Sequence, residues 1–260
     1  MIFHSSVETF YFLLPLLGFI IGLFGTMLGG GGGFFFLPIL TLFLGVPAQT
    51  AVITSLVATL PIGIIGTASH YRKGNVNPRI GFLFAIAGIM GAIVGAGITS
   101  LISENQLKVG FGIYSILIAF HMIYNTIKQA NTEQKNGVVV FEKAKASFFG
   151  LCAGLITGTF GTSGTAPILA GLFSMNIPLK MVIGTSLMVV LTNSLFAVGA
   201  HFLVGTIDLT LVGFLTIGST IGALLGPFLL SKVKTDKSES KVKYIYALVI
   251  VAIGIAMIIG

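Results

Sequence analysis

Long apolar segments separated by short polar connections make up most of this 260-residue chain. Uncharged stretches at residues 11–71, 80–103 and 181–205 are each long enough to cross a bilayer core of about 30 Å. The apolar residues run continuously instead of alternating, which favours helices over a membrane β-barrel. In the first half the pattern predicts helical segments at residues 11–28, 34–44, 48–70, 80–102 and 106–127. The second half repeats them from about Ala146 to Gly260.

The second segment of each half is too short to span the bilayer core alone. We therefore expect it to be either one arm of a re-entrant hairpin or a steeply tilted, broken helix. Both arrangements would place irregular backbone at membrane depth, where it must be buried in protein or line a wet cavity.

Composition indicates a membrane environment. The chain is 55% hydrophobic and 8% charged, with a mean hydropathy of +1.05, whereas soluble domains carry roughly 25% charged residues. The net charge of +7 comes from Lys and Arg in the short connections, which is typical of topology signals and not of a nucleic-acid surface. We therefore expect an all-α polytopic protein of the cell (inner) membrane with no nucleic-acid partner. The first apolar segment lacks a basic leader and a cleavage site, so we expect it to be retained.

The residues that would support enzyme chemistry are missing. Cys152 is the only cysteine, which excludes an internal disulfide and a thiolate metal cluster. No HExxH, GxSxG or clustered carboxylate motif is present, so we expect no enzyme activity, metal or cofactor. No charged residue lies clearly within a spanning segment, which leaves no evident carboxylate for proton or sodium coupling.

The two halves of the chain resemble each other. A shift of 129 places Gly29, Gly32 and Pro38 on Gly158, Gly161 and Pro167, and after a two-residue insertion a shift of 131 continues the match. The second register aligns residues 54–56, His70 and Gly74 with residues 185–187, His201 and Gly205. These matches predict a tandem repeat of residues 1–127 and 146–260, joined by a polar linker at 128–145.

Loop charges indicate how the repeats are oriented. Residues 70–79 hold three cations, whereas the equivalent residues 201–210 hold none. Residues 232–243 hold five lysines, whereas the equivalent residues 103–108 hold one. By the positive-inside rule, equivalent loops then lie on opposite faces of the membrane. We expect an inverted repeat with a cytoplasmic linker and with both termini extracytoplasmic.

Glycine-rich breaks follow the first segment of each half. Residues 29–33 are five consecutive glycines, and each glycine costs a helix roughly 1 kcal/mol relative to alanine. The segment after such a break begins with bare N–H groups and a positive dipole end, which suit an anion. Residues 158–165 form a second glycine-rich break, which also contains hydroxyl groups. The alternative is that these glycines only permit close helix packing.

The breaks and the following helices supply the predicted binding residues. We expect the substrate to contact residues from Gly30, Gly31, Gly32, Gly33, Phe34, Thr54, Ser55, Gly161, Thr162, Ser163, Gly164, Thr165, Thr185, Ser186 and Asn193. The alternative for the helical hydroxyls is a bond back to the carbonyl four residues earlier. His70 and His201 are either solvated helix caps or a gate or proton-responsive group, because histidine titrates near neutrality.

The glycine run ending in Pro38-Ile39-Leu40, its echo at residues 161–169 and the paired Thr-Ser-Leu resemble the TauE/SafE family of sulfite exporters. The resemblance covers essentially the whole chain. It implies a transporter of sulfur-containing oxyanions, such as sulfite, organosulfonates or thiosulfate. The thiosulfate-importing branch relies on cysteines along its pathway, and this chain has only Cys152.

We therefore expect an exporter of sulfite or a C2–C3 organosulfonate, with the small anion and the bilayer as its partners; an oligomer is possible but not indicated by the sequence. Alternating access would come from rocking of the two halves around a midplane site. The main alternative is a proton-coupled importer of another small anion, such as thiosulfate or a carboxylate, with His70 or His201 as the coupling group. A passive channel is a further alternative, distinguished by a much higher flux.

Overall fold

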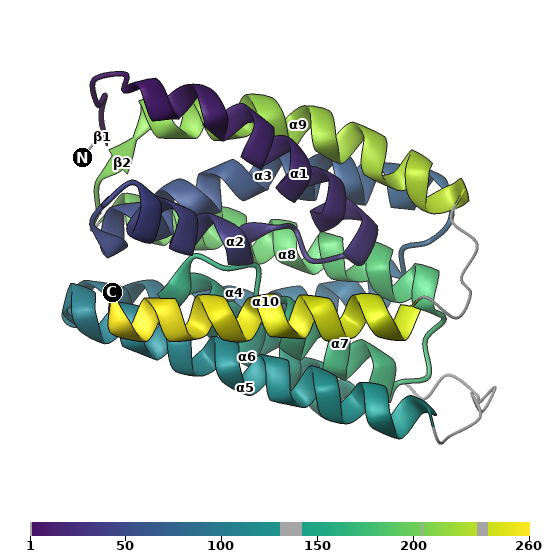
Figure 1. Cartoon of the computed structure of the whole chain (residues 1–260). Coiled ribbons are helices and arrows are strands. Elements are labelled where there is room, and N and C mark those ends of the chain that lie inside the picture. The colour runs from purple at the N-terminus through teal and green to yellow at the C-terminus, as the bar shows by residue number, and fades with distance from the viewer. Residues whose placement is uncertain (1, 131–141, 204, 233–238) are drawn as a thin grey trace.

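The computed structural model describes residues 2–130, 142–203, 205–232 and 239–260. Within them the chain is a helical bundle (Figure 1). Its helices are α1 (Leu14–Leu28), α2 (Gly33–Pro38), α3 (Ala48–Arg72), α4 (Pro78–Leu101), α5 (Glu104–Ala130), α6 (Lys143–Phe160), α7 (Thr165–Ser174), α8 (Leu179–Phe202), α9 (Leu209–Lys232) and α10 (Glu239–Ile259). A 3-10 turn, η1 (Thr9–Leu13), precedes α1, and a π-helical turn, η2 (Ile39–Phe43), continues α2.

Six segments in the described part of the chain are long and apolar enough to cross a membrane: Thr9–Met27, Ala48–Arg72, Pro78–Leu101, Glu104–Tyr124, Leu179–Phe202 and Leu209–Leu229. Large apolar side chains such as Phe82, Phe120 and Leu248 are exposed on the outside of the bundle, as expected where lipid is the solvent. The polytopic all-α class predicted from hydropathy is confirmed. The expected linker and the lysine-rich connection at 232–243 lie largely outside the described residues.

The short second helix of each half is one arm of a hairpin. Two short strands, β1 (Ile2–Phe3) and β2 (Ile207–Asp208), pair in parallel beside the start of α1. At the start of α3, the hydroxyl of Thr50 lies 2.9 Å from that of Thr206, next to β2. Since α1 and α3 begin at the same end of the bundle, α2 and η2 bring the chain back to the end where α1 entered (Figure 1).

Glycines allow the closest helix packing, and they do so at matched places in the two halves. A methyl group on Gly222 of α9 would collide with the carbonyl oxygen of Phe19 in α1. A methyl group on Gly91 of α4 would collide with the carbonyl oxygen of Leu151 in α6. The two glycines are 131 residues apart and their partners 132 apart. Close packing by small residues, which we considered as an alternative for the breaks, thus operates along these helix pairs.

In the first helix of each repeat, structurally equivalent residues are 132 positions apart. The shift of 129 predicted from the sequence is therefore wrong by three residues in this helix. Gly29 and Gly161 both end their helices in the left-handed conformation, and Gly32 and Gly164 both precede the next helix in that conformation. The shift of 129 instead pairs Gly29 with Gly158. Glycines recur about once per turn along the packed face of this helix. An alignment of the two halves that is wrong by nearly one turn therefore still places most glycines on glycines.

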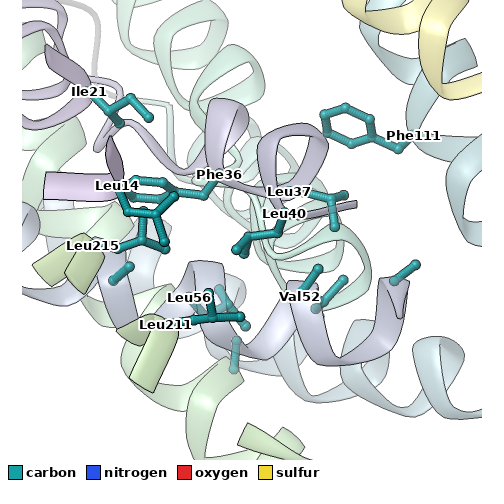
Figure 2. Packing of buried hydrophobic residues seen from close by; sticks show 14 of the residues in the cluster. Leu14, Ile21, Phe36, Leu37, Leu40, Val52, Leu56, Phe111, Leu211 and Leu215 are labelled. Carbon is teal, nitrogen blue, oxygen red and sulfur yellow. The ribbon is translucent and has the colours of Figure 1, made fainter. Parts of the chain in front are cut away.

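The halves of the sequence are not separate bodies. One hydrophobic core is formed mainly by α1, α2, α3 and α9, and Figure 2 shows side chains from these helices packed together. A second core is formed by α4, α6, α7 and α8. Each core therefore combines three helices of one half with one helix of the other, while α5 and α10 pack as a pair. We name the two groups of four helices the first and second core bundles.

Candidate functional site

Both glycine breaks are held in backbone conformations that favour glycine. Residues Gly29, Gly31 and Gly32 have φ values of +74°, +61° and +73°. In the second break Gly161 and Gly164 have φ values of +65° and +54°. A side chain in this left-handed region costs roughly 1–2 kcal/mol. The breaks are thus defined turns, each joining the end of one helix to the start of a helix that runs back.

The two breaks meet inside the bundle. The hydroxyl of Thr165, at the start of α7, donates to the carbonyl oxygen of Gly30, with an oxygen–oxygen distance of 3.0 Å. The Ser163 hydroxyl lies 2.7 Å from the Thr165 hydroxyl. A methyl group on Gly33, at the start of α2, would lie 3.2 Å from the amide nitrogen of Ser163. The amino-terminal ends of α2 and α7 therefore face each other.

A serine from the opposite half fixes each break. The Ser186 hydroxyl of α8 donates to the carbonyl oxygen of Gly29 at 2.8 Å, and the Ser55 hydroxyl of α3 donates to that of Gly161. The serines are 131 residues apart and the glycines 132 apart. Both hydroxyls also lie within hydrogen-bond distance of a carbonyl three residues earlier in their own helix. The paired serines thus bond locally to the carbonyl three residues earlier, not four as in the alternative that we considered, and they also hold the breaks in place.

The two histidines are buried, so the interpretation as solvated helix caps is wrong. His70 and His201 are each 2% exposed, because each packs against the last turn of the helix before its own break. Nε2 of His201 lies 2.6 Å from the carbonyl oxygen of Gly158. His70 lies beside the backbone of Thr26, the equivalent position, but neither of its ring nitrogens has a hydrogen-bond partner among the described residues. Their role as a gate or proton-responsive group stays a prediction.

Three predicted site residues have contacts outside the facing helix ends. The Thr185 hydroxyl accepts from the amide of Asn77, at the start of α4. The ring of Phe34 packs against that of Phe111 on α5, with the ring centroids 5.1 Å apart. The side chain of Asn193 lies against Gly88 of α4.

Two predicted residues hold buried polar groups without partners. The side-chain nitrogen and oxygen of Asn193 have no hydrogen-bond partner among the described residues. The same is true of the hydroxyl of Thr54. Such groups are rare in folded proteins, because an unpaired buried polar atom costs about 1–3 kcal/mol. By contrast, the Thr162 hydroxyl accepts from the amide of Gly164 within the second break, at 3.4 Å.

Thr59 of α3 lies at the meeting point of the breaks and was missed by sequence reasoning. A methyl group on Gly33 would lie 2.9 Å from its hydroxyl oxygen, which donates to the carbonyl of Ser55 at 2.8 Å. Its equivalent in the second half is Val190, which contacts Gly31. A search for hydroxyls shared by the two repeats therefore passes over Thr59. Its position one turn after Ser55 is the signal that could have found it.

The meeting point is mostly buried and has no charged residue in the segments that form it. Thr162 and Ser163 are 2% and 3% exposed, whereas Gly30 and Thr165 are partly exposed. Residues 9–71 and 146–179, which include both breaks, contain no Asp, Glu, Lys or Arg. The described residues include no group of three or more His, Cys, Asp or Glu that could hold a metal ion. With no cation in these segments, the helix ends and hydroxyl dipoles are the groups that could favour an anion here.

Comparison with known proteins agrees with this architecture. The profile of the family described as "Sulfite exporter TauE/SafE" matches residues 14–257. The probable membrane transporter protein YdhB of Bacillus subtilis is 28% identical over 82% of this chain and 88% of its own length. A probable membrane transporter protein of Xylella fastidiosa is 29% identical over 94% of this chain and 91% of its own. MJ0441 of Methanocaldococcus jannaschii, also a probable membrane transporter protein, is 30% identical over 72% of this chain and 71% of its own length.

The family profile spans nearly the whole chain, including both breaks, helices α1 to α9 and most of α10. The relatives align over most of their own length as well, so the likeness is not confined to one segment. The chain belongs to the TauE/SafE family and is a membrane transporter.

Proposed function

We propose that the protein exports a small sulfur-containing oxyanion, sulfite or a C2–C3 organosulfonate, which binds between the two glycine breaks. The observation that carries the proposal is the Thr165 hydroxyl, which lies between the Ser163 hydroxyl and the Gly30 carbonyl where α2 and α7 begin. The family description, "Sulfite exporter", supports the choice of substrate class.

The chemistry of the meeting point suits an oxyanion. The first N–H groups of a helix have no partner within it, so α2 and α7 both bring donors and positive dipole ends to one place. Ser163, Thr165 and Thr59 add hydroxyls. No fixed cation is nearby in the sequence, so the anion is held without a full ion pair and can be released. An inside-negative potential drives each negative charge outward by about 2.3 kcal/mol per 100 mV.

Binding requires the breaks to separate. The Thr165 hydroxyl donates its proton to Gly30, and Ser163 can then donate to Thr165, so both protons are already used within the protein. An oxyanion would replace the Gly30 carbonyl as the acceptor for Thr165. We infer that the described conformation is closed and that access from either side opens the contact between Gly30 and Thr165.

The moving bodies of alternating access are, in this proposal, the two core bundles and not the two halves of the sequence. Rocking of the halves would pull α1 from α9 and α4 from α6, where glycines bring backbones into contact. The core bundles keep those pairs intact and meet at the breaks. Inverted symmetry of the repeats is supported by Figure 1, where both termini lie at one end of the bundle, and α5 ends and α6 begins at the other.

Flux into liposomes tests the proposal. Purified protein should carry sulfite or a C2–C3 sulfonate, and Thr165→Val should remove most of that flux because valine keeps the shape but has no hydroxyl. Thr192→Val is the matched control, since among the described residues the Thr192 hydroxyl bonds only to the Met188 carbonyl in its own helix. Absence of flux for sulfite and for every C2–C3 sulfonate would refute the proposal, as would equal flux in the two variants.

The proton-coupled importer remains a testable alternative because His201 contacts the backbone one turn before the second break. Coupling through this residue would make anion uptake follow an imposed pH gradient and would be lost in His201→Gln. We expect instead that flux follows the membrane potential and is unchanged by the pH gradient.

A further inference from the structure

A hollow of about 540 Å³ opens on the outer surface of the bundle, away from the glycine breaks. It is lined by residues of α4 and by the first residue of α6: Arg79, Phe82, Leu83, Ile86 and Lys143. We call it the α4–α6 hollow. Its lining combines two cations at one end with apolar side chains from the next turns of α4.

The two cations are free to bind an anion. Arg79 is the second residue of α4 and Lys143 the first residue of α6, and both are exposed. The neighbouring carboxylate, Glu142, pairs with Lys145 at 2.8 Å. Within the described residues no carboxylate lies within ion-pair distance of Arg79 or Lys143. Both cations also lie at helix amino-termini, where the dipole adds to the positive potential.

The rest of the hollow fits an acyl chain. Phe82 and Ile86 are 60% and 61% exposed and lie about one and two turns beyond Arg79 on α4. They belong to a membrane-spanning segment, so lipid is their solvent. The order along α4, a cation at the helix start and then large apolar side chains, follows the order of headgroup and acyl chain in a phospholipid. Basic pockets between membrane helices are known to bind anionic headgroups.

The second half offers an internal comparison. An equivalent hollow of about 540 Å³ lies on α9 and is lined by Leu209, Val212, Gly213, Thr216, Ile217, Thr220 and Ile221. With the offset of 131, Phe82 and Ile86 correspond to Gly213 and Ile217 of this lining, and Arg79 corresponds to Thr210. This second hollow has a similar volume, but no charged residue lines it. The cations are therefore particular to the α4–α6 hollow and are not required by the fold of the repeat.

We propose that the α4–α6 hollow binds an anionic glycerophospholipid of the surrounding bilayer. The phosphate lies between Arg79 and Lys143, and an acyl chain lies along Phe82 and Ile86. The lipid then contacts both α4 and α6, a helix pair of the second core bundle whose backbones touch at Gly91 and Leu151.

Native mass spectrometry of the purified full chain in detergent tests the site, with phosphatidylglycerol and phosphatidylcholine as probes. We expect phosphatidylglycerol to bind at least tenfold more tightly. Arg79→Gln and Lys143→Gln should each weaken its binding about fivefold, and the double variant about 25-fold. Lys180→Gln is the matched control, because Lys180 is an exposed lysine at the start of α8, a different helix.

Three results with these lipids and variants would overturn the proposal. They are equal affinity for the two lipids, an unchanged preference in the double variant, and an equal loss in Lys180→Gln, which would indicate a diffuse basic interface. Millimolar inorganic phosphate should not displace the lipid, because it lacks the acyl chain. Displacement by phosphate would assign the site to a free anion instead.

Discussion

The most sharply defined perturbation of the breaks is Gly161→Ala. Gly161 ends α6 with a φ of +65°, and its added methyl group would collide with the carbonyl oxygen of Val52 and lie 2.8 Å from the Ser55 hydroxyl. Two costs therefore add. The left-handed backbone costs roughly 1–2 kcal/mol for alanine, and forcing extra volume against the backbone of α3 costs about 1–3 kcal/mol. We expect a total loss of about 2–5 kcal/mol in the free energy of unfolding.

The chain supplies a control that separates these costs. Gly74, in the connection between α3 and α4, has a similar φ of +69°, but a methyl group there meets nothing within 4 Å. Gly74→Ala should therefore lose only about 1–2 kcal/mol. Unfolding by sodium dodecyl sulfate in mixed micelles measures both variants, and liposome flux measures whether the strained break still transports. Equal destabilisation by the two substitutions, or full flux with undiminished stability in Gly161→Ala, would refute a break packed tightly on α3.

Other substitutions test the remaining contacts. Ser186→Ala leaves the Gly29 carbonyl without its cross-half donor and should cost about 1–3 kcal/mol in the same unfolding assay; no loss would mean that the bond does not fix the break. His201→Ala removes the side chain that contacts the backbone before the second break, and faster amide hydrogen exchange should appear at the end of α6. Gly222→Ala pushes α9 from α1 and should reduce the yield of folded monomer in size-exclusion chromatography. Gly213→Ala, with nothing within 4 Å of its methyl group, should leave the yield unchanged or raised.

The helices could be predicted closely because hydropathy and loop chemistry act locally. The segment predicted at 48–70 is α3, Ala48–Arg72, which begins after Pro47. The segment predicted at 80–102 is α4, Pro78–Leu101, which the Asn77 side chain caps by accepting from the Ile80 amide. Such signals depend on a few neighbouring residues, so one sequence is enough to read them.

Tertiary relations could not be predicted in the same way. The order of the repeats along the chain does not reveal that α9 packs on α1 and α4 on α6, because these contacts are made by glycines that recur throughout the sequence. The same recurrence allowed a three-residue slip in the register of the breaks. Burial of His70 and His201 also depends on neighbours that are distant in sequence, so their place at helix ends wrongly suggested solvation.

At the meeting point, sequence reasoning chose Ser163 and Thr165 because the second break contains hydroxyls. In the structure Thr165 bonds to the Gly30 carbonyl, and Ser163 bonds to Thr165. It missed Thr59, whose repeat partner is Val190, because the search relied on residues shared by the halves. It also chose Thr185, whose hydroxyl bonds to Asn77 instead. Adjacent residues on a helix point about 100° apart, so Ser186 and Thr185 cannot both face the break.

Anomalous diffraction from crystals grown with selenite tests the central claim most directly, because selenite is a close analogue of sulfite and selenium marks its own position. We expect one selenium peak between the breaks, placed so that the selenite oxygens accept from the Thr165 hydroxyl and the first amides of α2 and α7, and its loss in Thr165→Val. A selenite peak elsewhere in the bundle, with none between the breaks, would contradict the claim that these two helix ends form the anion site.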